Sequence, residues 1–269
     1  MKIISSKKKL KEFILNEKNL GFVPTMGAIH TGHLSLIKKS MSQCNKTIVS
    51  IFVNKPQFNR KNDFKKYPRI LKKDISLLKK TGVDYLYIPK FNQIYPNGIN
   101  KSIKIDSFEK KLCGRFRPQH FKSVADVIDR FVKLIHPKKM YFGEKDMQQF
   151  KIIEDFIKKN HPRIKVVGCK TIREKNGIAC SSRNFLLSLD EKVIASKIYE
   201  LLIKEKQSLI KRRIHLRDIK NKIFKIGATK IDYIKILDIN KLIKPYKKKN
   251  IYKIFIAYYL RKTRIIDNI

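Results

Sequence analysis

The sequence predicts an α/β protein: a Rossmann-like, doubly wound parallel sheet followed by a smaller C-terminal α+β domain. Up to about residue 170, short apolar runs alternate with stretches whose apolar residues recur at helical spacing. Polar clusters directly follow several of these runs, as expected where parallel strands end at a binding crevice. After residue 188, a long helical stretch and two β-rich runs replace the alternation. We therefore expect two domains in this chain of 269 residues, residues 1–172 and a lid formed by residues 173–269.

The first predicted unit is a strand that ends at Val23, a turn punctuated by glycines, and a helix. The helix is indicated by Leu34, Ile37 and Met41, which recur at helical spacing. Residues 46–54 are β-branched and almost uncharged, which is typical of a strand buried on both faces of a parallel sheet. Together these segments predict a βαβ unit.

The alternation continues with a helix at residues 70–80, which Gly82 ends, and a strand at residues 83–88. We expect loops at residues 92–98 and 111–121, where glycine and proline accumulate. A core-facing helix is predicted for residues 123–135.

A short strand at residues 140–142 follows, then a helix that opens near Asp146, whose carboxylate is expected to cap it, and a strand at residues 164–169. The pattern then changes, so we place the domain boundary between Lys170 and Ser188. Residues 188–191 have the form of a capping box that opens a helix through about residue 211. The β-rich runs at residues 231–239 and 251–259 predict a hairpin.

The composition favours a cytoplasmic protein over a nucleic-acid-binding or membrane protein. The net charge is +41, from 63 Lys and Arg against 22 Asp and Glu, but the lysines are spread over every segment and arginine is the minority cation. We therefore expect no specific nucleic-acid partner. The four cysteines show neither metal-ligand nor redox spacing, and no apolar run suits a signal peptide or a membrane span.

The candidate site begins at the turn after the first predicted strand. His30 and His33 lie three residues apart where the next helix should begin, so both can face one anion bound at the free N–H groups of the helix N-terminus. Polar residues also follow other predicted strands: Asn54 and Gln57, residues 143–146 with Gln148 and Gln149, and Arg173 with residues 181–183. Such clusters converge on one crevice of a parallel sheet.

This set of groups suits a nucleoside triphosphate that is attacked at a phosphorus. Histidines, a lysine, an arginine and serine hydroxyls can stabilise charge on phosphoryl oxygens without a covalent intermediate. Neither the Gly-x-x-x-x-Gly-Lys-Ser/Thr motif nor the Gly-x-Gly-x-x-Gly motif is present, which disfavours P-loop ATPases and dinucleotide dehydrogenases.

The motifs together resemble those of the pantothenate synthetase family, which belongs to the H-x-G-H nucleotidyltransferases. Their order and spacing match from the N-terminus to about residue 184 and again near residue 264. The matching segments are residues 24–33, 51–54, 57–58, 67–69, 94–98, 117–118, 120–121, 142–146, 148–149, 173–174, 181–184 and 264–268. One departure is Lys55, which separates Asn54 from the proline that directly follows this asparagine in the family.

The resemblance implies that pantoate attacks the α-phosphorus of ATP, giving pantoyl adenylate and pyrophosphate, and that β-alanine then displaces AMP to give pantothenate. It also implies a magnesium requirement and a homodimer. It assigns catalysis to His33, His30, Lys145 and Arg183, pantoate and β-alanine binding to Gln57 and Gln149, and a water-mediated magnesium contact to Asp74. The implied ATP site consists of Met26, Gly27, Ala28, Ile29, His30, Thr31, Gly32, His33, Gly143, Glu144, Lys145, Asp146, Ile172, Cys180, Ser181, Ser182 and Arg183.

Two alternatives stay open. Another H-x-G-H adenylyltransferase would activate a different carboxylic acid and would not need pantoate and β-alanine together. A basic RNA-binding protein would gather arginines and stacking aromatic residues on one face, whereas tyrosine and phenylalanine here fall mostly at positions expected in the core.

Overall fold

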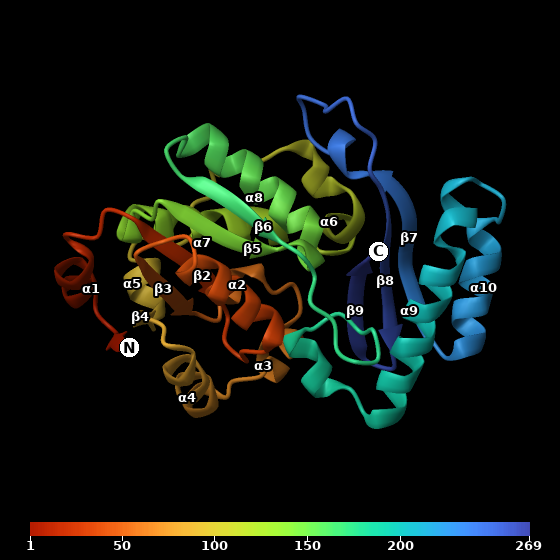
Figure 1. Ribbon diagram of the computed structural model, residues 1–269, viewed down its shortest axis with the longest axis horizontal. Coiled ribbons are helices and arrows are strands. Elements are labelled where there is room, and N and C mark those ends of the chain that lie inside the picture. Colours follow the sequence, from red (N-terminus) through yellow and green to blue (C-terminus); the bar gives the residue numbers. More distant parts are fainter.

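The computed structural model describes residues 1–269 and has a six-stranded parallel sheet at its centre (Figure 1). The strand order is β1-β4-β3-β2-β5-β6. The strands are β1 (Lys2–Ile4), β2 (Leu20–Thr25), β3 (Lys46–Ile51), β4 (Tyr85–Tyr87), β5 (Lys139–Gly143) and β6 (Lys165–Cys169). The chain runs outward from β2 to one edge and then returns to place β5 on the other side of β2. The carboxyl ends of β2 and β5 therefore flank the switch point of the sheet, where ligands bind in such folds.

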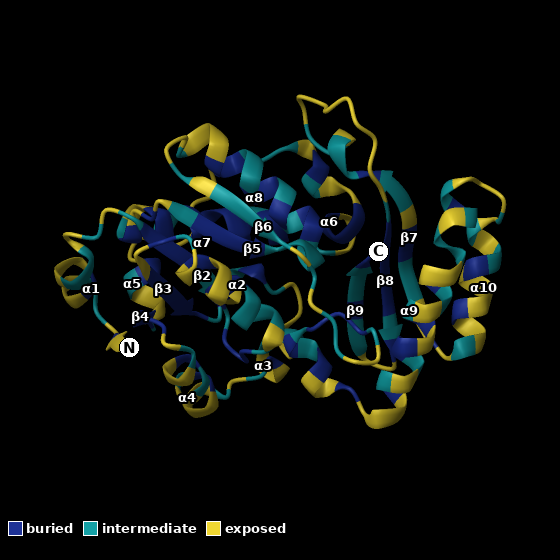
Figure 2. Cartoon of the chain, viewed as in Figure 1, coloured by how far each residue is buried: buried dark blue, intermediate teal, exposed yellow.

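Helices cover both faces of this sheet. The helices are α1 (Lys7–Ile14), α2 (Thr31–Met41), α3 (Lys61–Lys66), α4 (Leu71–Thr81), α5 (Phe91–Ile94), α6 (Leu112–Phe116), α7 (His120–Ile135) and α8 (Met147–Asn160). Neighbouring strand residues point to opposite faces: Phe22 packs in the core beneath α7 and α8, whereas Val23 packs in the core beneath α2 and α4. Figure 2 shows the central strands buried and the outer faces of α1 and α4 exposed.

A second, antiparallel sheet has the order β7-β8-β9 (Figure 1). Its strands are β7 (Lys230–Asp238), β8 (Tyr252–Leu260) and β9 (Thr263–Asn268), and its helices are α9 (Leu189–Ile210) and α10 (Leu216–Ile226). One face of the sheet packs against these helices. Tyr233, Phe255 and Ala257 instead join the hydrophobic core that includes α7 and α8, so the two sheets share a packed interface. Single 3₁₀ turns lie at η1 (Lys55–Gln57), η2 (Ser107–Lys110), η3 (Glu144–Asp146), η4 (Ser182–Leu186) and η5 (Ile239–Lys241).

The predicted α/β class is confirmed, as is the capping box, in which Ser188 accepts from the backbone N–H of Glu191 and Glu191 accepts from that of Ser188. The alternation ends at Cys169 and α9 begins at Leu189, on either side of the predicted boundary; the division into two domains stays a prediction. None of the helices combines the length and the apolar character needed to cross a membrane.

Several local expectations are wrong, mainly for short elements. The strand β1 and the helices α5 and α6 are three to five residues long, too short to show a hydrophobic period. Residues 263–268, for which no element is predicted, form a third antiparallel strand. Asp146 precedes α8, but its side chain makes no capping hydrogen bond.

Candidate active site

A cavity of about 1220 Å³ opens at the carboxyl ends of β2 and β5 and is closed on its other side by α9 and β9. The four polar clusters that follow the strands all contribute to it, so their predicted convergence is confirmed, although Glu144 and Arg173 of these clusters do not line the cavity. The predicted residues on its wall are Met26, His30, Gly32, His33, Gln57, Gly143, Lys145, Asp146, Gln149, Ile172, Cys180, Ser181, Ser182 and Arg183. Gly27, Ala28, Ile29, Thr31, Glu144 and Asp74 are not part of that wall.

The turn between β2 and α2 has an unusual backbone that an aspartate holds in place. Gly27 and Ala28 both have positive φ, 78° and 51°. The buried Asp74 carboxylate accepts from the N–H of Ala28 at 2.9 Å and from the N–H of Ile29 at 2.8 Å. A Cβ at position 27 would lie 3.0 Å from the same carboxylate, so glycine is required there for space as well as for φ. Asp74 thus sets the direction in which the chain enters α2.

His30 and His33 lie together at the start of α2, with ring centroids 4.0 Å apart. His30 is the N-cap residue, and its Nδ1 accepts from the N–H of Gly32 at 3.2 Å. Burial lowers the pKa of His30 to about 4, helped by the charge of Lys145. Burial also holds the pKa of His33 well below its ordinary value, with further lowering by His30 and Lys145. Both imidazoles are therefore neutral at neutral pH, and Nδ1 of His33 has no partner within the protein.

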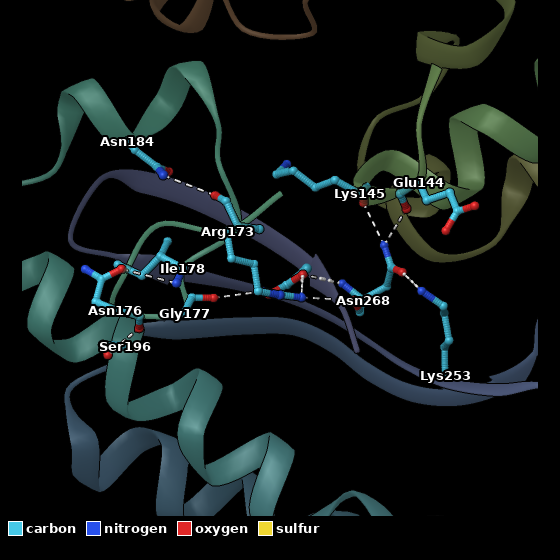
Figure 3. Close-up of polar contacts among 12 residues, drawn as sticks. Glu144, Lys145, Arg173, Asn176, Gly177, Ile178, Asn184, Ser196, Lys253 and Asn268 are labelled. Carbon is cyan, nitrogen blue, oxygen red and sulfur yellow. Dashed lines mark hydrogen bonds and ion pairs between the residues drawn. The ribbon is translucent and has the colours of Figure 1, made fainter. Parts of the chain in front are cut away.

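The loop after β5 presents Lys145 to the cavity. The side chain of Lys145 is 16% exposed, and its Nζ lies 3.6 Å from Asp146 Oδ1. The backbone of this loop is held from β9: the side-chain amide of Asn268 donates to the carbonyls of Glu144 and Lys145, both at 2.8 Å (Figure 3). The side chain of Lys145 therefore extends from a backbone segment whose carbonyls accept hydrogen bonds from Asn268.

The turn of residues 181–183 reaches the cavity from the opposite side and contacts the histidine turn. Ser182 Oγ donates to the carbonyl of Ala28 at 3.3 Å, and Ser181 Oγ caps η4 by accepting from the N–H of Arg183 at 3.3 Å. The guanidinium of Arg183 lies 3.1 Å from the Asp63 carboxylate, which leaves other N–H groups of its fork without protein partners. A phosphate between the two turns would meet hydroxyl, guanidinium and imidazole groups.

The two adjacent glutamines of α8 have different surroundings. Gln148 is buried, and its amide is saturated by the N–H of Cys113 and by the carbonyls of Phe108 and Lys111, so it holds the segment before α7. Gln149 lines the cavity and makes no side-chain hydrogen bond to another residue. The side chain available to a substrate is therefore Gln149.

Gln57 is oriented from several directions, although Lys55 rather than proline directly follows Asn54. Its Oε1 accepts from Asn54 Nδ2 at 3.1 Å, and its Nε2 lies 3.0 Å from Met26 Sδ. Its carbonyl accepts from His120 Nδ1 at 2.8 Å. Lys55, Pro56 and Gln57 together form the single 3₁₀ turn η1.

Comparison with known proteins agrees with this geometry. The family model for pantoate-beta-alanine ligase matches residues 2–269. The chain belongs to the pantoate-β-alanine ligase family. Pantothenate synthetase from Clostridium botulinum strain Loch Maree is 41% identical over 276 residues, covering 100% of this chain and 98% of the relative. Pantothenate synthetase from Sulfurihydrogenibium is 41% identical over 261 residues, covering 94% of this chain and 92% of the relative.

Solved structures of this ligase family share the whole fold. The crystal structure of pantothenate synthetase from Thermus thermophilus has a TM-score of 0.91 at 31% identity and covers 100% of this chain and 99% of its own. The ligase from Francisella tularensis, crystallised with beta-gamma ATP and β-alanine, has a TM-score of 0.86 at 36% identity. The match covers 100% of this chain and 97% of the Francisella chain.

The residues of this ligase do not build a magnesium site of their own. No group of three or more His, Cys, Asp or Glu side chains is placed to hold a metal ion. Asp74, expected near magnesium, is 2% exposed, and each carboxylate oxygen already accepts from a backbone N–H. The carboxylate therefore holds the histidine turn, and its water-mediated contact with magnesium stays a prediction. Mg²⁺ is usually bound through substrate phosphates and water, which requires no such cluster.

Sequence reasoning missed the residues that position the site. Asp74 was expected at the metal rather than behind the histidine turn, and Asn268 was only part of a matching motif. Each acts across a long sequence separation, 46 residues from Asp74 to Ala28 and 123 from Asn268 to Lys145. A buried polar residue at the core-facing side of a helix or strand is the one available signal, because such groups need partners.

We expect Asp74→Asn to destabilise the protein and to lower ligase activity. An amide can accept from only one of the two N–H groups and presents its own N–H₂ to the other, so one buried donor loses its partner, which costs about 1–3 kcal/mol. Urea denaturation and steady-state AMP formation measure the two effects. Asp84→Asn is the matched control, since Asp84 also accepts from a backbone N–H, that of Thr47, away from the cavity. Recovery of the Asp74→Asn rate in excess magnesium would instead support the metal role.

Stability of the unliganded protein should fall as the pH is lowered from 6.5 towards 4. His30, with its pKa lowered to about 4, stays neutral in the folded state over this range, whereas in the unfolded chain it takes up a proton. Each such histidine contributes a slope of at most about 1.4 kcal/mol per pH unit. Across this range, the melting temperature of His30→Gln should depend less steeply on pH than that of the wild type. His215→Gln serves as the control, because His215 is exposed. Equal slopes in all three proteins would contradict the buried, neutral state of His30.

Proposed function

We propose that this chain condenses pantoate with β-alanine through a pantoyl adenylate, at the expense of ATP. The observation that carries the proposal is the meeting of His30 and His33 with Lys145 and the 181–183 turn at one cavity, in a chain of the pantoate-β-alanine ligase family. The Francisella tularensis relative was crystallised with beta-gamma ATP and β-alanine, ligands of the kinds this reaction uses.

In the first step, a carboxylate oxygen of pantoate attacks the α-phosphorus of ATP, and the bond to pyrophosphate breaks. The negative charge grows on the phosphoryl oxygens, where positioned cations and N–H donors stabilise it. Lys145 and Arg183 supply the cations, and the N-terminus of α2 supplies backbone N–H groups and the positive end of its dipole. The neutral rings of His30 and His33 donate N–H without adding a charge, with His33 as the residue closest to an acid-like role.

In the second step, the uncharged amine of β-alanine attacks the acyl carbonyl of the adenylate. The amide bond forms, the bond to AMP breaks, and the amine loses a proton. Gln57 and Gln149 hold the pantoyl group by hydrogen bonds. Gln57 is oriented for this by Asn54, and Gln149 has both ends of its amide free for the substrate.

Other properties stay predictions of the family resemblance: dependence on Mg²⁺ carried by the phosphates, a homodimer, a cytoplasmic location, and a C-terminal lid domain from residue 173. The lid role is supported by β9 and α9 forming one wall of the cavity.

The test is AMP release by purified protein given ATP, magnesium, pantoate and β-alanine, with each acid or amine omitted in turn. We expect AMP and pantothenate in equal amounts only when both are present. His33→Ala should melt as the wild type does and lose at least about a hundredfold in rate, the scale of removing one transition-state donor. AMP formation with a different acid in place of pantoate would favour another H-x-G-H adenylyltransferase.

A further inference from the structure

The side chain of Asn268 is buried between the two sheets (Figure 3). Both its amide nitrogen and its amide oxygen have hydrogen-bond partners. Its two amide protons go to the carbonyls of Glu144 and Lys145, each at 2.8 Å. Its Oδ1 accepts from Lys253 Nζ at 2.8 Å. Because an ammonium can only donate and a carbonyl can only accept, the amide can lie only this way round.

These contacts act on the backbone from which the Lys145 side chain extends. The loop of residues 143–146 has few other restraints: η3 is a single turn, and Asp146 makes no cap. Lys145 reaches the cavity from this loop and helps to lower the pKa values of His30 and His33, so its charge is felt at the histidine pair. Small displacements of a catalytic group lower rates strongly.

The neighbouring residue, Asp267, connects the same strand to the other side of the cavity. Its carboxylate forms a bidentate ion pair with Arg173, at 2.7 and 3.0 Å. Arg173 also donates to the carbonyl of Gly177, and its guanidinium lies over the ring of Tyr199. The segment that Arg173 begins leads directly to Ser181. Two consecutive residues of β9 therefore hold the loop of Lys145 and the approach to the 181–183 turn.

We infer that Asn268 is a positioning residue for adenylation: its side-chain amide fixes the carbonyls of residues 144 and 145 and thereby places the Lys145 ammonium at the phosphates. This inference rests on the proposed function. The pair of parallel N–H donors is the essential feature, and a side chain that only accepts cannot replace it. Lys253 contributes by holding Oδ1 and so the orientation of the amide.

The decisive variant is Asn268→Asp, which keeps the shape and the acceptor for Lys253 but removes both donors and opposes two carbonyls with a carboxylate. We expect kcat for AMP formation to fall about tenfold or more, with a smaller change in KM for ATP, because the lysine acts mainly in the transition state. Lys253→Met should give a smaller loss in the same direction. Thermal melting of each variant reports folding, and Asn240→Asp is the matched control, since Asn240 also donates to a carbonyl, that of Lys249, outside the cavity.

A double-mutant cycle with Lys145→Ala separates positioning from general stability. If Asn268 acts through Lys145, Asn268→Asp should change the residual rate of Lys145→Ala by less than about twofold. Losses that multiply in the double variant, or an Asn268→Asp enzyme with wild-type kcat, would overturn the inference. If Asn268→Asp does not fold, a wild-type kcat in Lys253→Met would overturn it as well. A wild-type protein that releases no AMP would instead overturn the proposed function, and the inference with it.

Discussion

The site depends on one carboxylate. Asp74 accepts from two consecutive backbone N–H groups of a turn whose φ angles at Gly27 and Ala28 are both positive. A chain without that acceptor would bury two unpaired donors at the point where β2 passes into α2. With the turn fixed, His30 caps α2, and the carbonyl of Ala28 is left facing the hydroxyl of Ser182. The geometry of the groups proposed to bind the phosphates thus follows from a residue that does not line the cavity.

The cavity combines charged side chains with neutral hydrogen-bond donors. The protein carries a net charge of +41, yet the groups nearest the start of α2 are two imidazoles that burial and Lys145 keep neutral. Arg183 is partly neutralised by Asp63. A triphosphate bound here would meet a lysine that lies beside the Asp146 carboxylate, an arginine with spare N–H groups and several neutral donors. Neutral donors stabilise growing charge without the repulsion that adjacent cations would exert on one another.

Much of the fold and the main side chains of the site could be predicted because they depend on local patterns. Buried β-branched runs identify parallel strands, and the carboxyl ends of such strands must share an edge of the sheet, which is why His33 and Lys145 could be expected together. The supporting residues could not be predicted in this way. Asp74 lies on a helix and Asn268 on a strand, and only tertiary packing decides which backbone groups they meet. For the same reason, Gln148 and Gln149 look alike in sequence and both line the cavity, although the amide of Gln148 is saturated by protein partners and that of Gln149 is not.

Asn268, which supports the loop of Lys145, belongs to the last strand to be synthesised. The parallel sheet is complete in the nascent chain once β6 has been synthesised at Cys169, and domains generally fold as they emerge from the ribosome. At that stage the histidine turn already has Asp74, but the carbonyls of Glu144 and Lys145 still lack the amide that β9 brings. A chain that ended at β6 would contain every strand of the parallel sheet, but it would lack both the Asn268 amide and the residues Tyr233, Phe255 and Ala257 of the shared core. The loop of Lys145 therefore gains this support only after β9, the last strand of the structure, has been synthesised.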